Sequence, residues 1–196
     1  MNALKIHNIS FSYGEHRIFE NLSFEVAAGE RVCLNSASGS GKTTLLRLIA
    51  GLETSDSGEI SREGEIFYLF QEDRLLPHLS AAENLRFVGA SRDEAVSALE
   101  AVGIADFADA RPSELSGGMR RRVALARLCC FGNKFDKSLQ KKSLLLLDEP
   151  FTGLDAESRE CSARAIALAF PRTAAIIATH SPDEAALLGA SRILRL

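Results

Sequence analysis

The sequence predicts an α/β fold in which helices flank a mostly parallel sheet. A short glycine-rich turn stands between an apolar run at 31–35 and a helical pattern at 45–50. Residues 144–147 form a continuous apolar run, as is typical of a strand buried on both faces, and residues 173–179 are expected to form another buried strand. A helical pattern over about 156–170 separates these two segments. Strands that alternate with helices along the chain favour a parallel sheet.

The first part of the chain predicts a small antiparallel β layer beside the main sheet. Residues 4–12 and 18–26 alternate apolar and polar side chains, as half-buried strands do. A turn at 12–16 joins them as a hairpin would. Residues 59–70 are expected to contain two short strands around Glu63-Gly64, without an assignment to either sheet.

The middle of the chain predicts a helical subdomain. Ser80 and Ser91 are each followed three residues later by a glutamate, the capping-box pattern of a helix start. We expect this subdomain over about residues 72–115, within a single domain that spans residues 1–196. The lysine-rich stretch at 132–143 is expected to be an exposed insertion. Further elements are expected at the end of the chain, a helix at 181–188 and a strand at 193–194.

Composition and charge exclude several classes of protein. The chain has 196 residues, of which 46% are hydrophobic and 25% charged, as is ordinary for a soluble domain. A net charge of −3 does not suggest a nucleic-acid partner. No apolar run approaches the roughly 18 residues of a membrane span, and the N-terminus lacks a signal-peptide core. We therefore expect the chain to remain in the cytoplasm.

Three of the four cysteines lie in apolar segments and are expected to be buried thiols.

The glycine-rich turn has the layout of a phosphate-binding loop. Its main-chain N–H groups and the start of the following helix can both face an anion. Lys42 supplies a cation for the terminal phosphates, and Thr43 offers Mg²⁺ a hydroxyl oxygen. Ser36 stands where glycine is usual, and a positive φ there would cost about 1–2 kcal/mol. Taken alone, the stretch could also be a polar surface loop. The candidate residues are Ser36, Ala37, Ser38, Gly39, Ser40, Gly41, Lys42, Thr43 and Thr44.

Two carboxylates follow the apolar run at 144–147. Ligands of open parallel sheets bind at the carboxyl ends of the strands, so Asp148 and Glu149 should lie beside the phosphate loop. Asp148 could hold Mg²⁺, and Glu149 could accept a proton from an attacking water molecule. The alternative is a solvated acidic turn.

A third pattern is Ser116-Gly117-Gly118, which opens a predicted helix. Each glycine costs about 1 kcal/mol in a helix interior. Close approach of a phosphate to bare N–H groups would explain both glycines. The alternative is simply a flexible helix start.

Together with Ala178-Thr179-His180, these motifs resemble the ATP-binding subunits of ABC transporters, over about residues 4–196. The resemblance implies a P-loop NTPase core that binds ATP and Mg²⁺ and hydrolyses ATP. It also implies a head-to-tail dimer that encloses two ATP molecules, and we expect the two chains to be identical. In such a dimer Ser116, Gly117 and Gly118 bind the γ-phosphate held by the other subunit.

The resemblance assigns further roles by position. Tyr13 is similar to the aromatic residue that stacks on adenine. Gln71 corresponds to the glutamine that joins the metal shell and senses the membrane partner. Asp155 corresponds to the aspartate of a segment that crosses to the other subunit, and His180 to the histidine that contacts the γ-phosphate. Catalytic roles thus fall to Glu149, His180 and Gln71.

The segment 71–77 is most similar to importers of the nitrate, sulfonate and taurine branch, and thiamine-type importers look similar. The resemblance therefore implies a small-solute importer whose motor binds transmembrane permease subunits at the cytoplasmic face of the membrane. One alternative is a soluble ATPase of the same type that clamps a non-membrane partner. Another is a scaffold that binds ATP without hydrolysing it, which only Ser36 favours.

Overall fold

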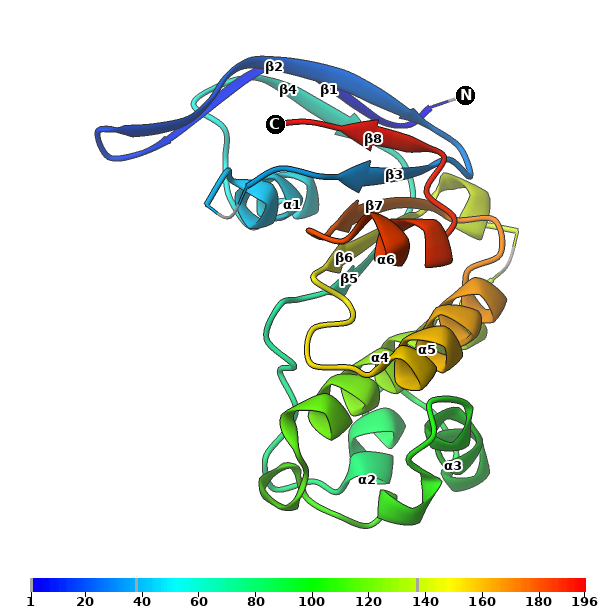
Figure 1. Ribbon diagram of the computed structural model, residues 1–196. Coiled ribbons are helices and arrows are strands. Elements are labelled where there is room, and N and C mark those ends of the chain that lie inside the picture. Colours follow the sequence, from blue (N-terminus) through cyan, green and yellow to red (C-terminus); the bar gives the residue numbers. More distant parts are fainter. Residues whose placement is uncertain (1, 38, 137) are drawn as a thin grey trace. The chain divides into compact units, whose positions relative to one another are not determined.

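The computed structural model describes residues 2–37, 39–136 and 138–196. The chain divides into two compact units, each of which is described by itself. The first unit comprises Met1–Tyr68, Lys137–Asp148 and Arg172–Leu196, and the second comprises Leu69–Asp136 and Glu149–Pro171. Figure 1 labels the helices and strands.

The first unit holds both β-sheets. Its elements are β1 (Asn2–Tyr13), β2 (His16–Ala27), β3 (Arg31–Leu34), α1 (Lys42–Ala50), β4 (Ser57–Arg62), β5 (Ile66–Leu69, whose last residue belongs to the second unit), a 3₁₀ turn (Gln140–Lys142), β6 (Leu144–Asp148), β7 (Ala174–Ala178), α6 (Pro182–Leu187) and β8 (Arg192–Leu194).

The larger sheet has the strand order β5-β6-β7-β3-β8. The β6–β7, β7–β3 and β3–β8 pairs are parallel. Every residue of β6 and β7 is buried, as their continuous apolar sequences predicted. The α/β class expected from the sequence is confirmed.

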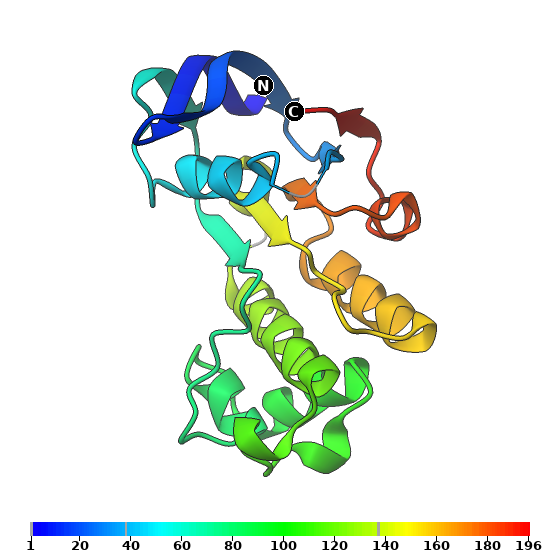
Figure 2. The same ribbon diagram turned by 60° about the vertical axis from the view of Figure 1, so that its left-hand side comes forward.

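The smaller sheet is antiparallel, in the order β2-β1-β4. Ile6 of β1 lies opposite Phe24 on one side and Ile60 on the other. Figure 2 shows α1 between this sheet and the strands β5 and β6. One apolar cluster accordingly joins residues of all three layers, among them Ile6, Leu45 and Leu146. The predicted antiparallel layer is therefore part of the same core as the phosphate-loop helix.

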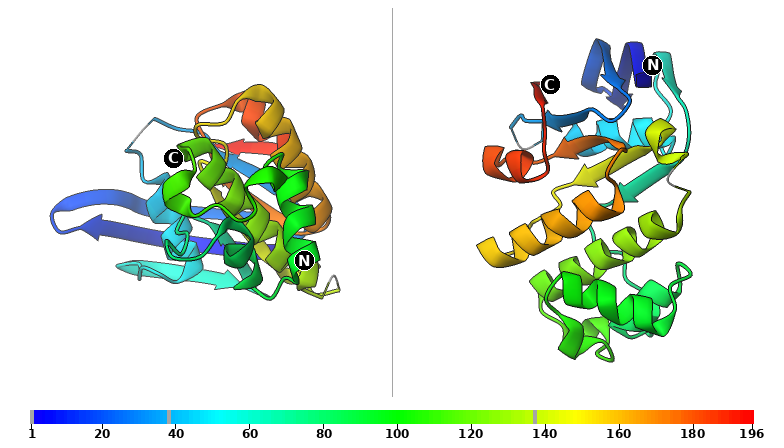
Figure 3. Two further views of the ribbon diagram at one scale, coloured as in Figure 1. Left: turned by 90° about the horizontal axis from the view of Figure 1, so that it is seen from below. Right: turned by 90° about the vertical axis from the view of Figure 1, so that its right-hand side faces the viewer.

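The second unit is helical. Its elements are α2 (Ala81–Arg86), α3 (Arg92–Ala101), a 3₁₀ turn (Ala105–Phe107), a second 3₁₀ turn (Pro112–Glu114), α4 (Gly117–Lys134) and α5 (Ala156–Ala169). Both predicted capping boxes are present, at Ser80 and at Ser91. Figure 3 shows α4, in green, beside α5, in orange. The segment expected as a helical subdomain, residues 72–115, falls within this unit. In the ranges described, no helix has the length and apolarity that crossing a bilayer requires.

The lysine-rich stretch is less exposed than expected. Its first residues complete α4, and a Cβ at Gly132 would lie 2.3 Å from the Phe170 ring, so this turn of the helix packs closely against the end of α5. Gln140 is fully buried, whereas Lys142 is exposed and pairs with Glu63 at 3.1 Å. Lys137 lies outside the described residues. The expectation of an exposed insertion is thus wrong for Gly132 and Gln140, because long-range packing covers them.

The cysteines are free thiols, and Cys33, Cys129 and Cys130 are buried as predicted. Burial raises the pKa of Cys129 to about 12 and that of Cys130 to about 11. Both thiols therefore stay protonated at neutral pH and act as small apolar groups in the helical core.

Candidate functional site

The parallel register brings three strand ends to one edge of the larger sheet. Leu34 of β3 lies opposite Ala178 of β7, and Asp148 of β6 lies opposite the same Ala178. The phosphate loop follows β3 directly, and His180 follows β7 by two residues. The candidate groups of the first unit therefore meet at the carboxyl edge, where open α/β sheets bind their ligands.

Lys42 lies at the centre of the phosphate loop. Its side chain is only 7% exposed. The ammonium Nζ donates to the carbonyl oxygens of Ser36 at 2.8 Å and of Ala37 at 3.3 Å. The Nε2 atom of His180 lies 3.2 Å from the same Nζ. The loop thus encloses a positive charge that main-chain carbonyls and one imidazole hold in position.

The turn of the loop depends on glycines in the left-handed region. Gly39 has φ +81° and Gly41 has φ +91°, and Gly41 is the N-cap residue of α1. Ser36 is not among the described non-glycine residues that have positive φ, so the strain considered from the sequence does not arise. Its hydroxyl instead forms a 2.6 Å hydrogen bond with that of Ser40. Ser38, also a candidate, lies outside the described residues.

Replacing Gly41 by alanine is expected to destabilise the protein by about 2–5 kcal/mol, because left-handed strain and steric overlap add. A Cβ at this position would lie 2.5 Å from Ile18 Cγ2 and 2.8 Å from Phe19 Cζ. Gly14→Ala is the matched control, because Gly14 also has positive φ but a Cβ there would meet no atom of the described residues within 4 Å. Urea unfolding of both variants measures the difference. Equal losses of unfolding free energy would contradict the steric argument.

Thr43 and Asp148 form the pair best suited to a divalent cation. The Thr43 hydroxyl donates to Asp148 Oδ1 at 3.1 Å, and Asp148 is 1% exposed. A hydroxyl and a carboxylate are the hard oxygen donors that Mg²⁺ prefers. The residues present therefore fit a magnesium ion. Thr44, the last residue of the loop motif, is buried in the first turn of α1.

Tyr13 lies at the end of β1, beside the hairpin turn. Tyr13 is 45% exposed, and its ring contacts that of Phe11 edge-to-face, with centroids 4.8 Å apart. The contact supports the ring from one side and leaves it accessible to a flat ligand such as a purine base.

In the second unit, Glu149 has a strained main chain. Its φ is +44°, a conformation that side-chain-bearing residues rarely adopt. Its carbonyl oxygen accepts hydrogen bonds from Arg121 Nη2 at 2.7 Å and from the Thr152 hydroxyl at 3.2 Å. Strain of this kind persists where surrounding contacts impose it, and such residues cluster at active sites.

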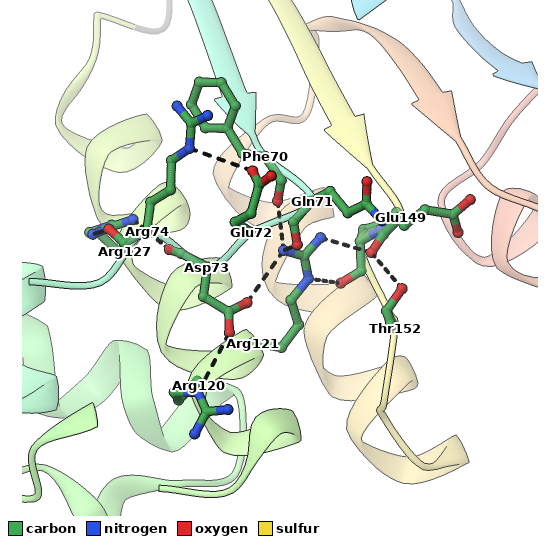
Figure 4. A network of polar contacts seen from close by, with 11 residues as sticks. Phe70, Gln71, Glu72, Asp73, Arg74, Arg120, Arg121, Arg127, Glu149 and Thr152 are labelled. Atoms are coloured by element: carbon green, nitrogen blue, oxygen red, sulfur yellow. Dashed lines mark hydrogen bonds and ion pairs between the residues drawn. The ribbon is translucent and has the colours of Figure 1, made fainter. Parts of the chain in front are cut away.

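Gln71 lies in the same unit as Glu149. Its side chain is exposed, and its carbonyl oxygen accepts from Arg121 Nη1 at 3.2 Å. Figure 4 shows both residues attached to the same guanidinium through their main chains. The unit therefore connects two of the predicted catalytic residues through one side chain.

The Ser-Gly-Gly segment starts α4, as predicted. The Ser116 hydroxyl accepts from the N–H of Met119 at 3.2 Å and caps the helix. A Cβ at Gly118 would lie 2.8 Å from the carbonyl oxygen of Gly153, so packing within the unit already requires a glycine there. At Gly117, the nearest atom of the described residues to a Cβ would be Arg120 Nη2, at 3.9 Å. Gly117 is therefore the glycine that packing leaves unexplained and that a ligand could require.

Asp155 is the N-cap residue of α5. Its Oδ1 atom accepts from the N–H of Ser158 at 2.8 Å. This main-chain hydrogen bond is the largest of the causes that lower the pKa of the Asp155 carboxyl. The local role was not predicted from the sequence, although an aspartate at a helix start is a usual N-cap.

Arg121 was also not among the residues predicted from the sequence. Its side chain is 3% exposed, and its guanidinium contacts both segments that carry Gln71 and Glu149. A signal was available, because Arg121, Leu125 and Leu128 lie four and three residues apart and so share one buried face of α4. An arginine on an otherwise apolar face requires acceptors inside the fold.

Comparisons with known proteins agree on one kind of protein. A family model described as ABC transporter matches residues 19–152. The aliphatic sulfonates import ATP-binding protein SsuB of Granulibacter bethesdensis is 41% identical, over 99% of this chain and 79% of that protein. SsuB 1 of Pseudomonas syringae pv. tomato is 40% identical, over 98% of this chain and 70% of that protein.

Among solved structures, a dimeric ATP-binding cassette in a post-hydrolysis state, bound to ADP and Pi, has a TM-score of 0.81 and 27% sequence identity. The alignment covers 98% of this chain and 94% of that one. The similarity therefore extends over nearly the whole chain in both sequence and backbone.

Proposed function

We propose, from the premise that this chain belongs to the ABC transporter family, that it drives the import of a small solute through a membrane permease. As a member it is an ATP-binding and ATP-hydrolysing subunit of a membrane transporter. We propose in addition the direction of transport, the solute, the metal ion, the partners and the roles of the individual site residues.

The observation that carries the proposal is the arrangement around Lys42. The buried ammonium is enclosed by loop carbonyls, His180 lies beside it, and Thr43 is hydrogen-bonded to Asp148. Lys42 and the loop N–H groups would bind the β- and γ-phosphates of ATP. Thr43 and Asp148 would hold Mg²⁺, which would offset the charge of the phosphate oxygens. The exposed ring of Tyr13 would stack on adenine.

In this proposal Glu149 accepts the proton of the attacking water molecule, and His180 contacts the γ-phosphate. Gln71 contributes a side-chain oxygen to the metal shell and responds to the permease. Glu149 suits its role, because contacts from Arg121 and Thr152 hold its strained main chain in place. A base held in one orientation does not have to be ordered during each turnover.

We propose that the active form is a head-to-tail dimer of two such chains. Ser116, Gly117, Gly118 and Asp155 would then act on the ATP of the other copy. The structural relative, an ATP-binding cassette, is a dimer bound to ADP and Pi, which supports this assembly. Two permease subunits at the cytoplasmic face of the membrane would complete the transporter.

The solute is proposed to be an alkyl sulfonate or a similar small organic anion. The support is that the relatives at 40–41% identity are named aliphatic sulfonates import ATP-binding proteins. A motor subunit does not contact the solute in this arrangement, so its residues alone do not select the solute.

Purification of the tagged chain from its native membranes in mild detergent tests the proposal. We expect a permease with several membrane spans to co-purify, and growth on alkyl sulfonates as sole sulfur source to fail when the gene for this chain is deleted. Recovery from the soluble fraction with no membrane partner would instead favour the alternative of an ATP-driven clamp on a non-membrane protein. Normal growth on sulfonates together with a recovered permease would overturn only the choice of solute.

A further inference from the structure

Helix α4 carries arginines that bind the segment after β5. Arg127 donates from Nη1 to the carbonyl oxygen of Arg74 at 2.9 Å and from Nη2 to that of Asp73 at 3.0 Å. The guanidinium of Arg74 in turn lies over the ring of Phe70, with Cζ 3.6 Å from the ring centroid. The segment 70–74 is therefore held along its length by side chains, although it forms no strand or helix.

Arg121 differs from Arg127 because it binds two segments at once. Its Nη1 atom donates to the carbonyl oxygens of Phe70 at 2.7 Å and Gln71 at 3.2 Å. Its Nε atom donates to the carbonyl oxygen of Pro150 at 2.9 Å, and Nη2 donates to that of Glu149 at 2.7 Å. Figure 4 shows the guanidinium between these two segments.

The charge of Arg121 is compensated inside the fold. Asp73 Oδ1 lies 3.5 Å from Nη1, and four main-chain carbonyls accept hydrogen bonds from the guanidinium. Because the guanidinium is planar and rigid, fixing its nitrogen atoms on one segment also fixes the direction of those that face the other. The main chains of Gln71 and Glu149 are therefore held in one mutual arrangement.

Arg121 also lies one turn into α4, three residues after Gly118. A helix transmits displacement as a rigid body over such a short distance. A movement of the helix start would therefore move the guanidinium, and with it the main chains at Gln71 and Glu149.

We propose that Arg121 is a positioning residue for ATP hydrolysis. It fixes the positions of the main chains of Gln71 and Glu149 relative to each other, and it links both to the helix start formed by Ser116–Gly118. This inference rests on the proposed function, in which Glu149 is the base and the helix start engages the other subunit's ATP. Hydrolysis then depends on Arg121, whereas binding of ATP by the phosphate loop does not.

The test uses the whole 196-residue chain with Arg121→Met and Arg121→Lys. Arg121→Met removes every donor, and Arg121→Lys keeps the charge but not the planar fork. Misplacement of a catalytic group by about 1 Å can cost on the order of 100-fold in rate, so we expect kcat to fall by about 10- to 100-fold in both variants. The Kd for ATP should stay within about three-fold of the unsubstituted protein, because Arg121 holds the segments of Gln71 and Glu149, whereas the proposed binding of the phosphates depends on Lys42 and the loop.

A second readout separates positioning from damage to the fold. If hydrolysis is slow and binding is intact, ATP-bound dimer should accumulate during gel filtration with ATP and Mg²⁺. A destabilised protein would lose binding and dimer together. Arg127→Met is the matched control, because Arg127 lies on the same helix and also binds main-chain carbonyls, but only those of residues 73–74. We expect Arg127→Met to retain most of the hydrolysis rate.

Several outcomes would overturn the inference. They are a normal kcat in Arg121→Lys, loss of ATP binding in step with kcat, or an equal loss of kcat in Arg127→Met. The variant Glu149→Gln, measured beside them, keeps the two proposals apart. Normal hydrolysis by Glu149→Gln would contradict the proposed base. An inactive Glu149→Gln with a normal Arg121→Lys would contradict only the role of Arg121.

Discussion

Replacing Glu149 by glutamine is expected to lower kcat for ATP hydrolysis by about 10²- to 10⁴-fold, the usual contribution of a general base. Glutamine has nearly the same shape but cannot accept a proton from water. Its main chain should keep the strained conformation, because the hydrogen bonds from Arg121 and Thr152 go to the carbonyl oxygen and not to the side chain. The Kd for ATP should therefore change little.

The measurement is steady-state release of phosphate, with gel filtration in ATP and Mg²⁺ to detect a trapped dimer. Glu157→Gln is the matched control, because Glu157 is an exposed glutamate in the first turn of α5. We expect that control to hydrolyse ATP normally. Normal turnover by Glu149→Gln would remove Glu149 from the role of base and leave the family assignment unchanged.

Replacing Lys42 by alanine is expected to weaken ATP binding by on the order of 100-fold, since hydrogen bonds between charged groups contribute about 1.5–3 kcal/mol each. The substitution removes the buried cation that the loop encloses. It also removes the hydrogen bonds from Nζ to the carbonyl oxygens of Ser36 and Ala37, so the loop loses part of its internal support. Both effects act in the same direction on affinity.

Titration calorimetry with ATP measures the change, and urea unfolding shows whether the variant is folded. Lys142→Ala provides the control, because it removes an exposed lysine that pairs with Glu63 on the surface. Its Kd for ATP should match that of the unsubstituted protein. An unchanged Kd in Lys42→Ala would contradict the assignment of the phosphate loop.

Features that depend on neighbouring residues could be predicted from the sequence. The capping boxes at Ser80 and Ser91 involve contacts only three residues apart, and both are present. The continuous apolar runs predicted the buried strands β6 and β7, because a strand covered on both faces requires apolar side chains in succession. The combination of a phosphate loop with a strand that ends in Asp148 predicted that Asp148 lies beside the loop, and the hydrogen bond from Thr43 to Asp148 confirms this proximity.

The conformation of Ser36 could not be judged in this way. The sequence shows a serine in place of glycine but not the φ that its main chain adopts. The structure keeps Ser36 out of the positive-φ region and bonds its hydroxyl to Ser40. A glycine at position 41, in contrast, is required for two reasons. Its φ is positive, and a Cβ there would overlap side chains of β2 that are more than twenty residues away in sequence.

What the sequence alone determined is the order of elements, the fold class and the residues that form the loop, because these follow from periodicity, caps and short motifs. What only the tertiary structure decided is which distant groups meet. Arg121 binds carbonyls about 50 residues before it and about 28 residues after it. Gly118 packs on the carbonyl of Gly153. Every residue has a main-chain carbonyl oxygen, whatever its side chain. The sequence therefore does not show which carbonyl oxygens will accept a hydrogen bond from a distant side chain until the chain is folded.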